Sequence, residues 1–322
     1  MKNDFTRRDF IMSSAALAAS AAMANPLPSS PSPERGIRVR FLGSGAAGWR
    51  PDWLANSKHM RRQSSVLLEN RALIDFTPCS FDMLPKNCRP EVLFQTHSHG
   101  DHYNPAAAVK SGVKRIYVQE SWAADARREV SAAADRLSLP APDVIALPFG
   151  KAVEECGMRF MGVPANHSTS RVCDGVLERT SLYLVEKGES RLLYATDTGG
   201  IPGDAARMIG IDPHINAKTA MSPKEFIAPY VHRAQAITAF IMEATNGDAD
   251  EDFRVFVHSS VQTVSRIVNM LRKYDRFKPP SGQHAYLTHL AIKYRGWPAE
   301  DINAELPDTL RAAYDGQEVV LG

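Results

Sequence analysis

The chain has 322 residues, 44% of them hydrophobic, which is enough to bury the core of one large globular domain without a second domain being required. Its formal net charge at pH 7 is only +2, so charge gives no general reason to expect binding to nucleic acid or to an anionic membrane.

The N-terminus has the pattern of an export signal. Thr6 to Ile11 (TRRDFI) matches the bacterial twin-arginine motif, and an apolar stretch rich in Ala and Ser follows up to Met23. Ala22-Met23-Ala24 is a small-x-small cleavage site, so we expect residues 1–24 to form a signal peptide recognised by the twin-arginine export machinery. The alternative is a charged amphipathic helix at the N-terminus.

The export signal predicts a periplasmic or secreted protein. Its apolar stretch is shorter than the ~20 residues of a membrane span, so we expect no stable membrane anchor. Residues 25–36 are rich in Pro and Ser and are expected to form a flexible linker, followed by the mature domain at residues 37–322.

Apolar runs and helical patterns alternate along the mature chain and predict a mixed α/β protein. The expected strands are Ile37–Leu42, Ser65–Leu68, Ile116–Gln119, Met158–Val163, Ser181–Val185 and Leu192–Ala195. The clearest helix is Val261 to Tyr274, where Val264, Val268 and Leu271 fall on one apolar stripe. Either Ser259 or Ser260 is expected to cap it.

The four cysteines, Cys79, Cys88, Cys156 and Cys173, are too widely spaced for a Cys-x-x-Cys motif. Export to an oxidising compartment would permit disulfides, with Cys79 and Cys88 as the nearest pair, but four free thiols are an equal alternative.

A dense group of metal-binding side chains follows the apolar run Val92-Leu93-Phe94. His97 and His99 are two positions apart, so on extended backbone they project to the same side and can share one ion. The turn at Gly100 redirects Asp101 and His102 towards a second ion. The cluster therefore predicts a hydrolytic centre with two metal ions, whereas a lone histidine would be interpreted as an ordinary polar residue.

His97-x-His99-x-Asp101-His102 resembles the signature of the metallo-β-lactamase superfamily. That family adds a lone histidine, a bridging aspartate and a final histidine at strand ends, and His167, Asp197 and His289 follow in this order, each directly after a short apolar run. The resemblance extends from about Ile37 to His289. It also makes Asp75 a candidate to accept a hydrogen bond from a ligand histidine, with a turn-forming aspartate as the alternative.

The resemblance implies an αββα sandwich, in which two mixed sheets pack face to face with helices outside. It assigns His97, His99 and His167 to one metal, Asp101, His102 and His289 to the other, and Asp197 to the bridge between them. Zinc is the expected metal, although manganese or iron would accept the same ligands. Two neighbouring ions lower the pKa of a shared water from ~15.7 towards neutrality and so provide a hydroxide for hydrolysis.

Within the family, the pattern is most similar to the phosphodiesterase branch, which includes the cyclic phosphodiesterase of phosphonate degradation and the tRNA 3′-processing endonuclease. In that branch a histidine that binds no metal lies close to the position of His258 and serves as an acid or orienting group. His258 could protonate the leaving alkoxide, or it could simply lie at a helix boundary and contact backbone. Asp101 and His258 are therefore the candidate catalytic residues.

These features predict an exported, metal-dependent phosphodiesterase that acts on a small or cyclic phosphate ester, with a small molecule rather than nucleic acid as substrate. A lactonase is the main alternative because the same hydroxide could attack an ester carbonyl. A metal-binding protein without catalytic activity is a further alternative.

Overall fold

The protein is described by a computed structural model over residues 36–48, 59–212, 234–249, 253–294 and 296–322. The predicted signal peptide, and the predicted linker apart from Gly36, lie outside the described residues. None of the helices in these ranges combines the length and hydropathy that crossing a membrane requires.

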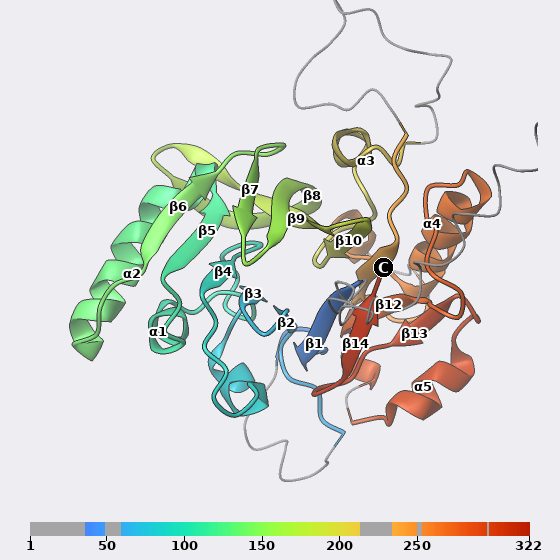
Figure 1. Cartoon of the computed structure of the whole chain (residues 1–322), viewed down its shortest axis with the longest axis horizontal. Coiled ribbons are helices and arrows are strands. Elements are labelled where there is room, and N and C mark those ends of the chain that lie inside the picture. The colour runs from blue at the N-terminus through green and yellow to red at the C-terminus, as the bar shows by residue number, and fades with distance from the viewer. Residues whose placement is uncertain (1–35, 49–58, 213–233, 250–252, 295) are drawn as a thin grey trace, which may run out of the picture. The chain divides into compact units, whose positions relative to one another are not determined.

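The described strands form two mixed sheets of seven strands each (Figure 1). The first sheet has the order β14 (Glu318–Leu321), β1 (Ile37–Gly43), β2 (Ser65–Leu68), β3 (Ala72–Ile74), β4 (Val92–Phe94), β5 (Arg115–Gln119) and β6 (Asp143–Leu147). The second has the order β13 (Leu310–Ala312), β12 (Ala285–Leu290), β11 (Ala239–Ala244), β10 (Ser190–Ala195), β9 (Val176–Lys187), β8 (Met158–Cys173) and β7 (Ala152–Glu155). In each sheet, four successive strands run parallel: β3 to β6 in the first and β10 to β13 in the second.

The two sheets bury a shared core between their inner faces. In β1, Ile37, Val39 and Phe41 are fully buried while the arginines between them are not, which is the alternation expected of a strand with one covered face. Across the interface, the ring of Phe94 in the first sheet stacks on that of Phe160 in the second, with centroids 3.9 Å apart.

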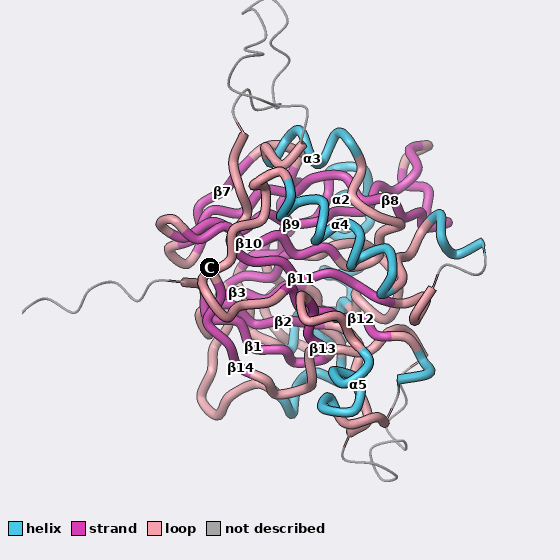
Figure 2. Tube along the Cα trace, turned by 90° about the vertical axis from the view of Figure 1, so that its right-hand side faces the viewer, coloured by secondary structure: helices cyan, strands magenta, loops and turns pink. Residues whose placement is uncertain are grey.

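Helices cover the outer faces of both sheets, as the sandwich prediction requires. The apolar faces of α1 (Pro105–Lys110) and α2 (Ala123–Leu137) belong to a core cluster with the first sheet, and those of α3 (Gly203–Ile209), α4 (Val261–Lys273) and α5 (Ala299–Glu305) to one with the second. Figure 1 shows α2 and α4 on opposite sides of the sheets, and in Figure 2 α4 and α5 lie in front of them. The αββα fold is confirmed.

The predicted elements occur where the patterns indicated, but several are longer. The prediction for β8 ended at Val163, whereas the strand continues to Cys173 and pairs with an equally extended β9. Helix α4 ends at Lys273, and Ser260 caps it by accepting a hydrogen bond from the amide of Thr263 at 3.1 Å.

All four cysteines are free thiols, so the pairing of Cys79 with Cys88 does not form. The Cys79 thiol is 3.1 Å from the Thr77 hydroxyl, and that of Cys88 donates to the carbonyl of Asn70 at 3.2 Å.

Candidate metal centre

The seven predicted ligands converge from four separate parts of the chain. The first four occupy the loop after β4, and the others are His167 in β8, Asp197 directly after β10 and His289 in β12. Their ligand atoms form two groups, each within 4.8 Å: His97, His99, His167 and Asp197 in one, and Asp101, His102 and His289 in the other. Both groups combine residues from the two sheets.

In the first group, three ring nitrogens face one another. The Nδ1 atom of His99 lies 3.0 Å from Nε2 of His97 and 3.2 Å from Nε2 of His167. The Oδ2 atom of Asp197 lies 3.5 Å from Nε2 of His97 and 3.7 Å from Nε2 of His167. Three imidazole nitrogens and one carboxylate oxygen therefore surround one point.

The second group has the same character and shares Asp197. The Nε2 atoms of His102 and His289 are 3.1 Å apart, and Oδ2 of Asp101 lies 3.4 and 3.3 Å from them. Oδ1 of Asp197 lies 3.3 and 3.2 Å from the same two nitrogens. Because its two oxygens face different groups, Asp197 is placed as a bridge.

The outer nitrogens of four of these histidines are held by acceptors. The Nδ1 atom of His97 lies 3.0 Å from Thr96 Oγ1, and that of His102 lies 2.7 Å from Asp75 Oδ2. The Nδ1 atom of His167 lies 3.0 Å from the Val257 carbonyl, and that of His289 lies 2.7 Å from Thr245 Oγ1. An imidazole that donates outward through Nδ1 presents a lone pair inward at Nε2.

The imidazole lone pairs and the carboxylate oxygens that face inward are all electron-rich. They repel one another unless a proton or a cation lies between them. This buried donor set therefore fits divalent metal ions, and a set of five imidazoles and two carboxylates suits zinc, manganese or iron. His97, His99, His167 and Asp197 would hold one ion, and Asp101, His102 and His289, again with Asp197, would hold the other.

The pKa values of the clustered side chains reflect the same competition for positive charge. Burial opposes protonation of His102, yet Asp197, Asp101 and Asp75 together raise its pKa well above the ordinary value. Burial, together with the nearby charge of His102, lowers the pKa of His97 well below its ordinary value. A proton on His102 and a metal ion therefore compete for the same carboxylates.

Asp75 fills the orienting role expected of it. Its buried carboxylate accepts hydrogen bonds from the amide of Thr96 and the side chain of Gln95, both at 2.8 Å, in addition to that from His102. Its φ of 55° is left-handed, and Asp197 (48°) and His289 (46°) share this conformation. Such backbone is costly for these residues and is typical of functional sites.

Glu178 in β9 is a residue that the sequence analysis missed. Its carboxylate accepts from the amide of Ser98 at 2.7 Å and from the Ser98 hydroxyl, and from Thr169 Oγ1 at 2.9 Å. Since Ser98 lies between two ligand histidines, this buried acid fixes their loop. No motif marks it, because it lies in a largely polar stretch of strand.

His258 lies beside the ligands, and Glu243 orients it. Its Nδ1 is 3.1 Å from both carboxylate oxygens of Glu243, which is fully buried at the end of β11. The His258 ring stacks near His289, with centroids 6.0 Å apart. Burial works against its protonation, but Glu243 raises the pKa of His258 above the ordinary value, so the imidazole gains a proton more readily.

A cavity of about 230 Å³ opens over the cluster. Besides the ligands and His258 it is lined by Ala46, Ala47, Thr245, Arg254 and Ile292. Arg254 comes from the 3₁₀ turn η5 (Phe253–Phe256), and its carbonyl accepts a hydrogen bond from the amide of His258 at 2.7 Å.

Three solved structures share the fold at low sequence identity. The metallo-β-lactamase fold protein YhfI from Bacillus subtilis has a TM-score of 0.56 and 12% identity, covering 89% of this chain and 100% of that one. Zn²⁺-bound PqqB from Methylobacterium extorquens has a TM-score of 0.57 and 15% identity, covering 88% of this chain and 99% of that one. The short form of human tRNase Z has a TM-score of 0.53 and 15% identity, covering 88% of this chain and 99% of that one. A search of curated proteins gives no match.

A sequence profile described as the β-lactamase superfamily domain matches residues 76–275, which is more than half of the chain. The chain belongs to this superfamily, whose members are metal-dependent hydrolases.

Proposed function

We propose that the protein is an exported two-metal phosphodiesterase, with zinc as the native metal, acting on a small or cyclic phosphate ester. One observation carries the choice of bond: Arg254 and His258 line the same cavity as the ligand cluster. Arg254 brings a positive charge to this lining, and a positive charge attracts a substrate that carries negative charge, as a phosphodiester does and a lactone does not.

His258 supplies what a phosphate ester with a poor leaving group needs. Glu243 holds Nδ1, which leaves Nε2 to deliver a proton to the departing oxygen as the P–O bond breaks and a water oxygen bonds to phosphorus. Bound metal ions would supply the acidity that makes this water nucleophilic and would offset charge on the phosphoryl oxygens. Asp101, on the cavity wall, helps to hold one ion and is the second catalytic candidate.

The proposal of export rests on the twin-arginine motif at Arg7-Arg8. Fractionation of cells that produce the full chain tests it. We expect the mature protein in the periplasm or medium, and expect Arg7→Lys with Arg8→Lys to retain it in the cytoplasm.

The substrate class is tested by offering the metal-loaded protein bis(p-nitrophenyl) phosphate, alkyl phosphodiesters and a panel of lactones. We expect phosphodiester cleavage that chelation abolishes. Lactone turnover without phosphodiester cleavage would instead identify a lactonase, and bound metal with neither activity would identify a metal-binding protein.

His258→Ala tests the proposed acid. We expect kcat for alkyl phosphodiesters to fall by about 10² to 10⁴, and the loss to be much smaller for p-nitrophenyl esters, whose leaving group needs no proton. His284→Ala is a matched control, since Nδ1 of His284 contacts the carbonyl of Asp308 and His284 does not line the cavity. Equal losses for both kinds of leaving group would contradict the role of acid.

A further inference from the structure

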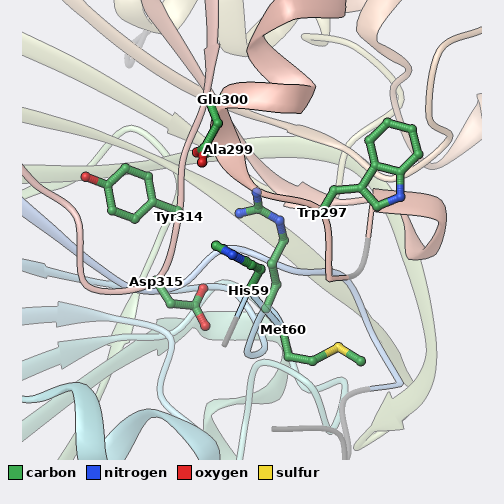
Figure 3. Close-up of a pocket in the computed structure, with 8 residues that line it drawn as sticks. His59, Met60, Trp297, Ala299, Glu300, Tyr314 and Asp315 are labelled. Atoms are coloured by element: carbon green, nitrogen blue, oxygen red, sulfur yellow. The ribbon is translucent and has the colours of Figure 1, made fainter. Parts of the chain in front are cut away.

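A second cavity, of about 280 Å³, shares no lining residue with the one over the metal ligands (Figure 3). The segment from Ser44 to Ala46 separates the two, since Ala46 lines the metal cavity while Ser44 contacts Arg61 in the second. The second cavity collects residues from distant parts of the chain, among them Arg61, Trp297, Glu300, Tyr314 and Asp315.

Arg61 is a buried cation with unused hydrogen-bond donors. Its side chain is only 5% exposed, and its Nη1 donates to Ser44 Oγ at 2.8 Å and to the Ala313 carbonyl. Within the described chain, Nε is buried without an acceptor, and no hydrogen bond of Nη2 is found. A buried donor without an acceptor destabilises the folded state, so an acceptor arriving through the cavity would be bound favourably.

The nearest carboxylate does not neutralise Arg61. The oxygens of Asp315 accept from the amide and hydroxyl of Ser44 (3.0 and 2.9 Å) and from the amide of Arg62 (2.7 Å), and Asp315 also pairs with the Arg62 guanidinium. No ion pair of Arg61 occurs among the described residues. Burial lowers the pKa of Arg61 to about 10, although Asp315 opposes this effect.

The rest of the cavity favours a flat ligand with one negative charge. Tyr314 and Trp297 lie on opposite sides of the view in Figure 3 and are 48% and 40% exposed, so both rings offer apolar surface. Glu300, in the first turn of α5, adds a carboxylate that repels polyanions and can accept from a ligand's hydroxyl or amine. A volume of this size is at the small end for ligand cavities and suits a single ring.

We propose that this cavity is a binding site for a small aromatic monocarboxylate. The carboxylate pairs with the free edge of Arg61, the ring lies between Trp297 and Tyr314, and a donor on the ring meets Glu300. Guanidinium groups bind carboxylates through strong, charge-assisted hydrogen bonds, and Nη2 is the Arg61 nitrogen that remains to donate one.

Calorimetric titration of the metal-loaded protein with 4-hydroxybenzoate tests the site. We expect saturable binding that weakens at least about tenfold in Trp297→Ala and in Tyr314→Ala. Tyr274→Ala is the matched control, since Tyr274 is an equally exposed ring at the end of α4 and should leave the affinity unchanged.

Three results would overturn the proposal. Absence of saturable binding would do so, as would binding that neither aromatic substitution affects, because a carboxylate held by the metal ions would behave in that way. Equal affinity for the neutral amide 4-hydroxybenzamide would exclude Arg61 as the recognising group. This comparison avoids replacing Arg61, whose contacts with Ser44 and Ala313 also support the fold.

Discussion

At the scale of single residues, buried carboxylates determine where the imidazoles point. Asp75 accepts four hydrogen bonds from three neighbours before any metal is considered, and one of them fixes His102. The orientation of this ligand is therefore set by the protein and not only by an ion.

Asp75→Asn should weaken metal binding without removing a ligand. The amide cannot accept at both former oxygens, so His102 loses its fixed orientation, and we expect affinity for zinc to fall by about 10- to 100-fold. Competition with a chromogenic chelator measures the change. Asp204→Asn, on the exposed first turn of α3, is the control, and equal affinity in the two variants would contradict the orienting role.

The sequence could single out the side chains of the candidate metal cluster but not the residues that support them. His97 to His102, His167, Asp197 and His289 are recognisable because metal chemistry restricts residue type and spacing together. Glu178 and Arg254 act through positions that only the folded chain brings together, so no local pattern marks either. Glu243 lies 15 residues before its partner His258, so their contact too depends on the fold.

At the scale of elements, two adjacent serines before α4 have separate tasks. Ser260 caps the helix, whereas Ser259 is buried, donates to the carbonyl of Thr198 at 2.8 Å and accepts from the amide of Gly200 at 3.0 Å. Ser260 therefore supports the helix, and Ser259 supports the loop that follows Asp197.

Replacing each serine by alanine should separate these tasks. Ser260→Ala should lower the free energy of unfolding by about 1 kcal/mol, the usual cost of losing a helix cap, and leave metal affinity unchanged. Ser259→Ala should also reduce metal affinity, because it loosens the loop of a bridging ligand. Chemical denaturation and metal titration measure both, and identical profiles for the two variants would refute the distinction.

Local patterns predicted strand cores better than strand ends. Periodicity in Met158 to Val163 identified the buried part of β8, but the segment beyond Val163 is largely polar, is mostly exposed or half-buried and carries little apolar signal. Its extension depends on pairing with β9, a partner that the sequence of β8 alone does not reveal.

At the scale of the whole molecule, contacts between the sheets include a charged link at one edge. Glu155 in β7 accepts from Arg115 Nε at 2.7 Å and Tyr117 Oη at 2.5 Å, both in β5 of the other sheet. Burial would raise the pKa of Glu155, but hydrogen bonds from Arg115 and Tyr117 outweigh it and lower the pKa below its ordinary value of 4.5.

This link should make part of the stability dependent on pH. Because the folded pKa is lowered, the ionised Glu155 stabilises the fold above about pH 4.5, and this contribution is lost as the pH falls through the lower folded value. Glu155→Gln should cost about 1 to 2 kcal/mol at pH 7 and less as the solution is acidified. Denaturation at several pH values tests this, with the exposed neighbour Glu154→Gln as control; a constant difference would contradict it.

Metal removal should destabilise the entire domain. Ions that bind only the folded chain add about 4 kcal/mol when present at 1,000 times their Kd, so chelation should lower the Tm and zinc should restore it. Calorimetry of the chelated and reloaded protein measures the effect. An unchanged Tm would mean that the cluster holds no ion.

The division of the ligands between the sheets links metal retention to the order of folding. The loop after β4 in the first sheet supplies two imidazoles to one candidate ion site and one imidazole with one carboxylate to the other, and ions held by these side chains alone would dissociate readily. Tight retention begins when the strand that carries His289, late in the sequence, has docked. Tight binding of metal at this cluster therefore requires both sheets to be in place.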